Sequence, residues 1–125
     1  NYIFNEMDTK PQTWGRPGEN ATSIQKKNYS NHIMNLTTQE QQSIDLILID
    51  GRFRVACCLK CYDIISEDSF IAFDDFLYRP YYHVVLDYFD IVEHNTTDDR
   101  MAILKKKRNV TVPKELIEKY ELDER

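Results

Sequence analysis

The chain has 125 residues, of which 30% are charged and 42% hydrophobic, and a formal net charge of −5. This length allows one domain with a modest core. No apolar run approaches the roughly 20 residues needed to cross a bilayer. Residues 45–99 hold twelve acids and four bases, which argues against a nucleic-acid surface there because phosphates would be repelled.

The first part of the chain mixes a short apolar segment with a long loop. Residues 2–4, Tyr-Ile-Phe, predict a strand that ends near Asp8. Residues 9–19, TKPQTWGRPGE, hold two prolines and two glycines and predict a loop. Residues 23–34 predict a short helix with scattered apolar positions.

The middle of the chain alternates strand and helix patterns. Residues 44–49 are almost all apolar and rich in β-branched side chains, which is typical of a central parallel strand buried on both faces. Residues 52–65 then carry apolar side chains at helical spacing. Residues 69–73 predict a second buried strand.

The last part predicts a helix, a hairpin and a tail. Residues 81–89 place Tyr81, Val84, Val85 and Tyr88 on one helical face, and residues 90–93 and 101–104 are close enough to form an antiparallel hairpin. Residues 110–125 hold one amphipathic helix, with Pro113 at its first position.

This order predicts an α/β fold with a mostly parallel sheet, flanking helices and a C-terminal antiparallel β-hairpin. We divide the chain into an α/β part, residues 1–108, and a helical tail, residues 109–125.

Five of the eight asparagines begin an Asn-x-Ser/Thr triplet. Such triplets are acceptors for N-linked glycans and indicate a chain that passes through the secretory pathway lumen or is extracellular. An Asn-rich coding bias is the alternative. The predicted glycosylation sites lie at loops or element ends: Asn20, Asn28, Asn35, Asn95 and Asn109.

The three cysteines, Cys57, Cys58 and Cys61, lie in the helix predicted for residues 52–65. Cys58 and Cys61 form a CxxC pair, which can be redox-active at a helix N-terminus. Because this pair lies well inside the helix, small apolar core packing is the favoured interpretation. No His/Cys set has zinc spacing.

Acidic residues follow three predicted strands: Asp8, Asp50, and the pair Asp74 and Asp75. Ligands of open α/β sheets bind outside the carboxyl ends of the strands, where adjacent tips lie roughly 5 Å apart. Carboxylates at that distance need a divalent cation, a shared proton or an arginine. The arginines available are Arg52, Arg54 and Arg79. A plain Asp–Arg network with helix-capping duty is the alternative.

The combination of these strand tips with two motifs resembles the C-terminal half of a class I methyltransferase that uses S-adenosylmethionine. The motifs are Asp50-Gly51-Arg52-Phe53-Arg54-Val55-Ala56-Cys57 and Arg79-Pro80-x-Tyr82-His83-Val84, with the loop Trp14-Gly15-Arg16-Pro17 before them. The likeness is to an uncharacterised branch of that superfamily with a Rossmann-like fold.

The resemblance implies S-adenosylmethionine as cofactor and methyl transfer to an oxygen of a small molecule or a glycan. Asp50 would face the methionine end of the cofactor or the acceptor, and Asp8, Trp14 and Gly51 are the other cofactor-binding candidates. Trp14 could stack on an adenine or an acceptor ring, and Arg16 could pair with a carboxylate or phosphate. Alternatively, Trp14 covers the sheet end and Arg16 pairs with Asp50 or Asp75.

Metal-dependent O-methyltransferases of the superfamily hold one magnesium ion at similar positions. Asp50, Asp74 and Asp75 would be its ligands here, and Mg²⁺ or Ca²⁺ would suit three carboxylates. The candidate catalytic residues are Asp50, Asp75, His83 and Arg79, with Asp75 or His83 as the base. For His83, packing on a helix face is the favoured alternative.

One feature of the sequence departs from the family pattern. The family's cofactor cradle is a glycine-rich turn after the first strand, but the only glycines here are Gly15, Gly18 and Gly51. By comparison with the family, we expect this chain to lack the first βαβ half of the fold. We therefore expect a fragment of a longer protein, a partner chain that completes the sheet, or a non-catalytic domain for binding or assembly.

Overall fold

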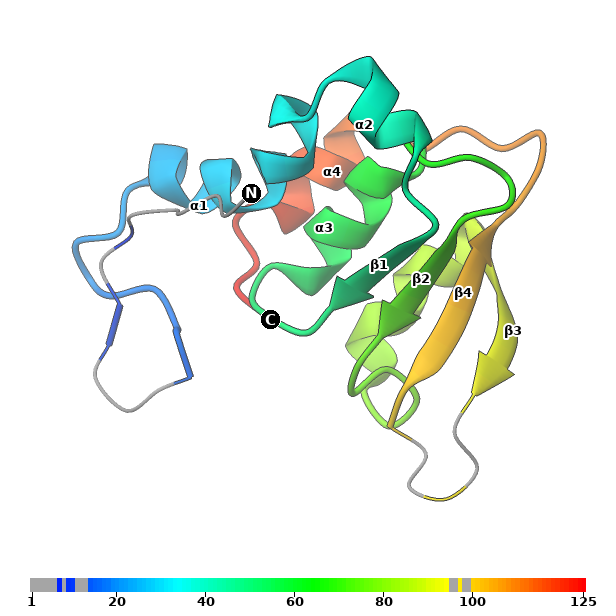
Figure 1. Ribbon diagram of the computed structural model, residues 1–125. Coiled ribbons are helices and arrows are strands. Elements are labelled where there is room, and N and C mark those ends of the chain that lie inside the picture. Colours follow the sequence, from blue (N-terminus) through cyan, green and yellow to red (C-terminus); the bar gives the residue numbers. More distant parts are fainter. Residues whose placement is uncertain (1–6, 8, 11–13, 95–96, 98–99) are drawn as a thin grey trace.

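The computed structural model describes residues 7, 9–10, 14–94, 97 and 100–125 of the chain. It contains helices and strands in an alternating order (Figure 1). The α-helices are α1 (Ser23–Asn31), α2 (Thr38–Gln42), α3 (Arg54–Cys61) and α4 (Lys114–Tyr120). Two 3₁₀ helices are η1 (His32–Asn35) and η2 (Pro80–Asp87), and the strands are β1 (Leu46–Ile49), β2 (Phe70–Phe73), β3 (Phe89–His94) and β4 (Ala102–Lys106).

The four described strands form one sheet in the order β1-β2-β4-β3. β1 pairs with β2 in parallel, and β4 is antiparallel to both β2 and β3. Three of these strands therefore run in one direction, and the closing hairpin inserts β4 between β2 and β3. The predicted α/β class with its C-terminal hairpin is confirmed.

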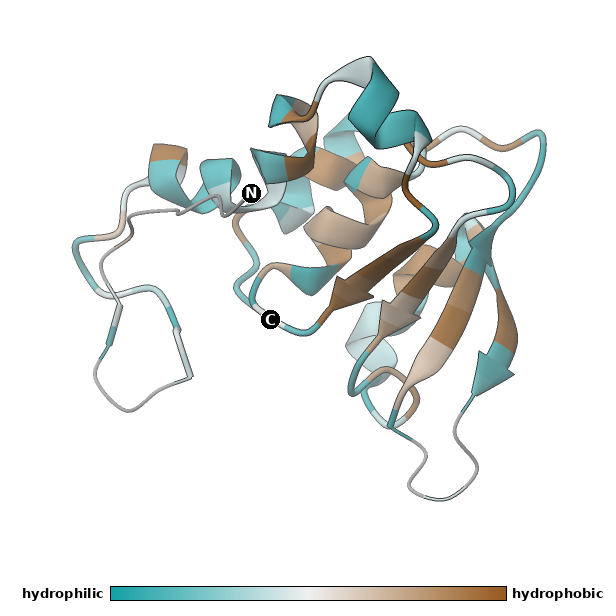
Figure 2. Ribbon diagram, viewed as in Figure 1, coloured by the Kyte–Doolittle hydropathy of each residue, from teal (hydrophilic) through white to brown (hydrophobic). Residues whose placement is uncertain are grey.

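One face of the sheet forms the core against α3 and η2. The inward residues of neighbouring strands lie opposite each other, with Ile49 beside Phe73 and Ile71 beside Leu104. These side chains are buried together with apolar residues of the covering helices, Val55, Leu59, Tyr82 and Val85. Figure 2 shows the hydrophobic colouring that follows the strands and α3.

The opposite face of the sheet is apolar and exposed at β1 in the described part of the chain. Leu46 and Leu48 of β1 point to this face and are 60% and 63% exposed. β1 lies at the edge of the sheet, and only β2 pairs with it among the described residues. The prediction of a central strand buried on both faces is therefore wrong for this structure, because nothing described covers β1 on its outer side.

Several helix predictions need correction. The segment predicted as a helix over 81–89 is the 3₁₀ helix η2. Val85 of the predicted face is buried, but Tyr82 replaces the exposed Tyr81 as the buried tyrosine. A 3₁₀ helix has three residues per turn, so residues three apart share a face. The polar helix α2 was not predicted; it begins at a capping box in which Thr37 and Glu40 bond each other's backbone. Pro113 precedes α4 as its N-cap rather than occupying its first position.

The C-terminal segment packs on the α/β part. α4 contacts α3, which also contacts α1. A largely buried polar cluster links these three helices. The Lys60 ammonium donates to Ser30 and Asn31 and pairs with Glu121. The last carbonyls of the chain accept hydrogen bonds from the first turn of α3, with Arg54 N donating to Arg125 O at 3.0 Å. The domain boundary at residue 108 stays a prediction.

The cysteines have the packing role that the sequence favoured. Cys58 and Cys61 are buried, and all three cysteines are free thiols. Burial raises the pKa of the Cys57 thiol to about 12 and also raises those of Cys58 and Cys61. A thiol with a raised pKa is a poor nucleophile at neutral pH, so the core-packing interpretation is confirmed.

Candidate functional site

A cavity of about 740 Å³ opens at the carboxyl ends of β1 and β2. Binding sites of open α/β sheets lie at this end, and the volume is in the range of small-molecule sites. Its lining consists of five arginines, three aspartates, a tryptophan and a glycine: Arg16, Arg52, Arg54, Arg79, Arg100, Asp50, Asp74, Asp75, Trp14 and Gly51. The predicted convergence of the two strand tips is therefore present.

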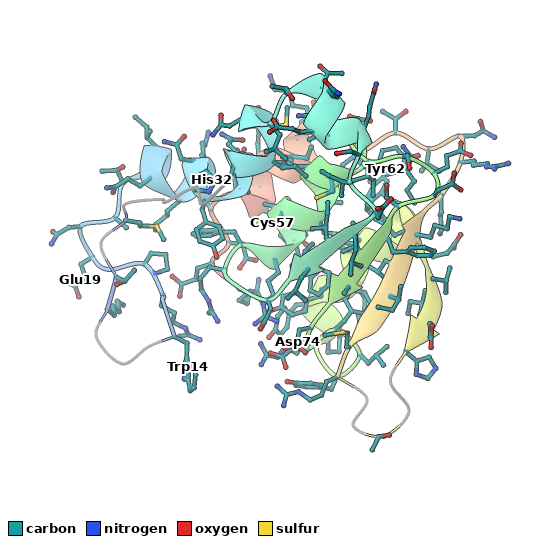
Figure 3. All side chains as sticks on the ribbon, viewed as in Figure 1. Trp14, Glu19, His32, Cys57, Tyr62 and Asp74 are labelled. Atoms are coloured by element: carbon teal, nitrogen blue, oxygen red, sulfur yellow. The ribbon has the colours of Figure 1, made fainter. Side chains whose placement is uncertain are left out.

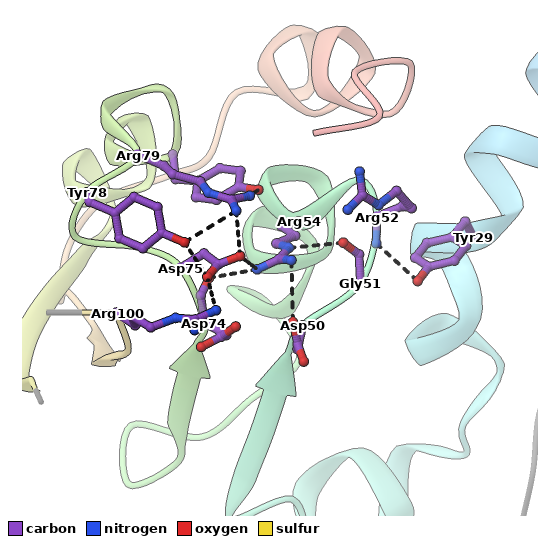
Figure 4. Close-up of polar contacts among 11 residues, drawn as sticks. Tyr29, Asp50, Gly51, Arg52, Arg54, Asp74, Asp75, Tyr78, Arg79 and Arg100 are labelled. Atoms are coloured by element: carbon purple, nitrogen blue, oxygen red, sulfur yellow. Dashed lines mark hydrogen bonds and ion pairs between the residues drawn. The ribbon is translucent and has the colours of Figure 1, made fainter. Parts of the chain in front are cut away.

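Arg54 bridges the tips of β1 and β2 (Figure 4). It is only 4% exposed. Its Nε donates to Gly51 O at 2.9 Å and one terminal nitrogen donates to Asp74 O at 2.8 Å. The guanidinium also pairs with Asp50 at 3.3 Å and with Asp75 at 3.4 Å. Each strand tip thus gives Arg54 one carbonyl and one carboxylate, and the buried charge is fully compensated.

Asp75 is the most heavily bonded acid of the site. Its Oδ1 accepts from the Tyr78 hydroxyl at 2.5 Å and from Arg100 at 2.9 Å, and its Oδ2 pairs with Arg79 at 2.8 Å. Burial alone would raise the pKa of Asp75, but the hydrogen bonds from Tyr78 and Arg100 and the charges of Arg79 and Arg54 lower it. Asp75 therefore stays ionised and fixed in place.

The loops after β1 and β2 both contain a residue in the left-handed region. Asp75 has φ 58° and the fully buried Phe53 has φ 52°. Asp tolerates this conformation, whereas for a bulky residue such as Phe it is rare and costs free energy. The hydrogen bonds of Arg54 and the ring contact between Phe53 and Tyr29, with centroids 5.4 Å apart, hold the loop in this shape.

The carboxylates of Asp74 and Asp50 have fewer side-chain partners than that of Asp75. Asp50 is 54% exposed at its side chain and pairs only with Arg54 among the described residues. Burial and the neighbouring charges of Asp75 and Asp50 raise the pKa of Asp74. Asp74 is thus more readily protonated than its neighbour Asp75, whose pKa is lowered.

The residues present do not fit the predicted three-carboxylate metal site. Both oxygens of Asp75 already accept from guanidinium or phenol groups, which leaves no free carboxylate face for a hard cation. Among the described residues, no group of three or more His, Cys, Asp or Glu side chains is arranged to hold a metal ion. Arginines, instead of the expected magnesium ion, neutralise the carboxylates of Asp50 and Asp75.

Gly51 has a packing reason to be glycine. A Cβ at this position would lie 2.3 Å from the Tyr29 hydroxyl. That hydroxyl accepts a hydrogen bond from Arg52 N at 3.2 Å and so ties α1 to the loop after β1. Sequence reasoning assigned Gly51 to cofactor binding and missed Tyr29, because no local pattern connects residues 22 positions apart.

The loop that carries Trp14 and Arg16 reaches the same cavity. The Trp14 ring is 92% exposed, and Figure 3 shows it on the loop away from the helices. Trp14 and Gly15 both have positive φ, in a turn whose arms pair Thr9 with Pro17. Arg16 lies 4.0 Å from Glu124 rather than beside Asp50 or Asp75. Because the Trp14 ring is so exposed, it does not cover the sheet end as the alternative interpretation expected.

The remaining predicted residues lie outside the cavity lining or outside the described residues. His83 Nε2 lies 2.9 Å from Phe76 O and its ring packs on Phe76, as the favoured alternative expected. Asp8 and Asn95 lie outside the described residues. Four predicted glycosylation sites are exposed, although Asn28 lies within α1 rather than at an element end: Asn20, Asn28, Asn35 and Asn109.

Comparison with known proteins supports the fold. The structure resembles a methyltransferase-like protein from Silicibacter pomeroyi with a TM-score of 0.69 and 20% sequence identity. The match covers 94% of this chain and 57% of the other, so the chain spans little more than half the length of that protein. No family model and no curated protein matches the sequence. The chain therefore has a methyltransferase-like α/β fold, and its activity is a separate question.

Proposed function

We propose that this chain is the acceptor-side part of an S-adenosylmethionine-dependent methyltransferase that modifies an oxygen of a small molecule or a glycan. The observation that carries the proposal is the cavity at the carboxyl ends of β1 and β2 in a fold of the methyltransferase type. This end of the sheet is where α/β enzymes bind their ligands.

The described residues supply candidate roles for such a reaction. When bound, S-adenosylmethionine would supply a methyl group already activated by its sulfonium. Asp50, half-exposed at the tip of β1, would face the cofactor or the acceptor. Asp74 is a better candidate base than Asp75, because the pKa of Asp74 is raised and that of Asp75 is lowered. Asp74 also lines the cavity, whereas His83 does not.

Asp75, Arg54 and Arg79 would position these groups. Asp75 is committed to three guanidinium groups and Tyr78, and its lowered pKa opposes proton uptake. The Arg54 network fixes the distance between the two strand tips. Preorganised polar groups of this kind are what a transferase needs around a reacting oxygen.

The cofactor site would be completed by further sequence or by a partner chain. β1 has exposed apolar side chains, Leu46 and Leu48, and one edge that no described strand pairs with. Both are features of a sheet that continues. The resemblance places the glycine-rich cradle in that missing half. Trp14, Asp50 and Gly51 would then form one wall of the cofactor site.

A non-catalytic domain for binding or assembly is the second candidate. One observation favours it: the chain has three glycines, and its sequence contains no GxGxG motif. In that case the cavity would bind a ligand without transferring a methyl group, and the open edge of β1 would be an assembly surface.

Calorimetric titration with S-adenosylhomocysteine separates the two candidates. The full-length protein that contains this chain is expected to bind it at one site. Asp50→Asn is expected to abolish methyl transfer from labelled S-adenosylmethionine to hydroxyl-bearing small molecules and glycans, while Asp90→Asn, at an exposed position on β3, leaves it unchanged. A folded protein that releases no heat with S-adenosylhomocysteine supports the binding domain instead.

We also propose that the chain belongs to the secretory pathway lumen or the extracellular space. The exposure of Asn20, Asn28, Asn35 and Asn109 is compatible with glycans. Among the described residues, no helix is both long and apolar enough to cross a membrane. Mass spectrometry of the natural protein before and after glycosidase treatment tests this proposal, and unmodified asparagines at all five triplets would contradict it.

A further inference from the structure

Arg52 is a cation of the cavity without a partner of its own. Its backbone N–H bonds Tyr29, but no side chain or carbonyl in the described part of the chain pairs with its guanidinium (Figure 4). The Nε atom is buried and lacks a hydrogen-bond acceptor. A buried donor without an acceptor costs free energy unless a ligand completes it.

The other charges that face the cavity are largely committed to one another. Asp75 holds Arg54, Arg79 and Arg100. Asp50 pairs with Arg54, and Arg16 lies 4.0 Å from Glu124, which is outside the lining. Asp74 is the remaining acid, and burial together with Asp75 and Asp50 raises its pKa. The lining therefore keeps two more arginines than aspartates in a chain whose net charge is −5.

We propose that the cavity binds a small anionic molecule and that the Arg52 guanidinium bonds its oxyanion group, a carboxylate, phosphate or sulfate. The inference rests on the proposed function in one respect: it names the class of acceptor that would be methylated. Anion binding by Arg52 itself does not require the transfer reaction.

The chemistry of the groups supports an oxyanion. A guanidinium presents its donors in a planar fork that matches the two oxygens of a carboxylate or phosphate. Unlike the guanidinium of Arg54, that of Arg52 has no hydrogen-bond or ion-pair partner among the described residues. The exposed ring of Trp14 lines the same cavity and offers a flat apolar surface to the rest of the ligand.

Trp14 also makes binding measurable, because it is the single tryptophan of the chain. Inorganic phosphate, sulfate and malonate are titrated separately at constant ionic strength, with chloride as the replacing anion. Tryptophan fluorescence reports the occupancy and calorimetry of the same samples provides a second readout. The wild-type protein is expected to bind at least one of the three anions saturably, and the preferred anion identifies the oxyanion type.

Three variants test the role of Arg52. Arg52→Gln is expected to weaken binding about tenfold or more, the effect of losing a charge-assisted hydrogen bond. Arg52→Lys keeps the charge without the fork and is expected to have intermediate affinity. The matched control is Arg108→Gln, because Arg108 is an exposed arginine that pairs with Glu67 outside the cavity; it should bind as the wild type does. Urea unfolding confirms that each variant is folded.

Two results would overturn the inference. One is wild-type protein that shows neither a fluorescence change nor heat with any of the three anions. The other is a pattern among the variants that gives Arg52 no special role. Such a pattern is equal affinity in Arg52→Gln and wild type, or an equal loss of affinity in Arg52→Gln and Arg108→Gln; the equal loss would indicate unspecific screening. Because these titrations contain no cofactor, they fail or succeed independently of the S-adenosylhomocysteine titration that tests the proposed function.

Discussion

Two arginines that lie two positions apart have opposite surroundings. Arg54 begins α3, is buried, and contacts a carbonyl and a carboxylate from each of two strand tips. Arg52 precedes it in the loop, and its guanidinium pairs with no described residue. Arg54 therefore contributes to the shape of the cavity, whereas Arg52 remains available to bind a ligand.

The same contrast separates the acids. Asp75 is fixed by four donors, and neighbouring Asp74 has a carboxylate that burial and like charges disfavour in its ionised form. Ionisable groups with perturbed pKa values are common at functional sites. The following predictions test this division, beginning with the largest expected effect.

Asp75→Asn should lower the free energy of unfolding by about 3 kcal/mol, because it leaves the buried Arg54 charge poorly compensated. Asparagine tolerates the positive φ of this position, so the substitution tests the charge rather than the backbone. Urea denaturation measures the change. Asp90→Asn, at an exposed ion pair, should change stability by less than about 0.5 kcal/mol; equal effects of the two substitutions would contradict the structural role of Asp75.

Gly51→Ala should destabilise the fold by about 2 kcal/mol, because the new Cβ would overlap the Tyr29 hydroxyl. The Tyr29 ring packs on Phe53 and cannot move away freely. Combining Gly51→Ala with Tyr29→Phe removes the clashing oxygen. Thermodynamic analysis of both single variants and the pair should show a favourable coupling, and simple additivity would show that the contact is not the cause.

The stability lost in Asp75→Asn should depend on pH. The native pKa of Asp75 is lowered, so its unfolded form, near the ordinary value of about 3.9, takes up a proton first as the pH falls. The stabilisation from Asp75 is present above about pH 4 and disappears as the pH falls through the native pKa. Urea midpoints at pH 7 and pH 3 should therefore differ more for the wild type than for the variant. Parallel pH dependence of both proteins would be inconsistent with the lowered pKa.

Asp74→Asn should have the smallest effect on stability and the opposite sign. It removes a carboxylate that burial and two neighbouring acids disfavour, while the backbone carbonyl that accepts from Arg54 remains. We expect a gain of about 0.5 kcal/mol at pH 7, with loss of activity if Asp74 is the base. Thermal unfolding at pH 7 measures the gain, and a clear destabilisation would mean that Asp74 has a structural partner.

Much of the architecture could be predicted from local patterns. The apolar runs at residues 44–49 and 69–73 and the closely spaced 90–93 and 101–104 predicted the strands that form β1 to β4. Helical spacing after residue 52 predicted α3 with its buried cysteines. These features depend on apolar runs for the strands and on helical spacing for α3, and a sequence shows both patterns directly.

The site was predicted only in part. The strand-tip acids were found because an acid after a buried apolar run is visible in a sequence. Of the three arginines named as candidate counter-ions, Arg54 and Arg79 pair with these acids, whereas Arg52 pairs with no described residue. Tyr78 and Arg100, which bond Asp75, were missed. Arg100 lies 25 positions from Asp75, and no local signal connects a residue at the start of β4 with the tip of β2.

The sequence by itself determined the four strands, the helix α3 and the convergence of carboxylates and arginines at one end of the sheet, because these follow from periodicity and strand direction. Only the tertiary structure decided which acid is neutralised by which base, because a guanidinium and a carboxylate attract at any sequence separation and their pairing depends on the final distances. That pairing places Arg54, Arg79 and Arg100 around Asp75 and leaves Arg52 facing the cavity among the described residues.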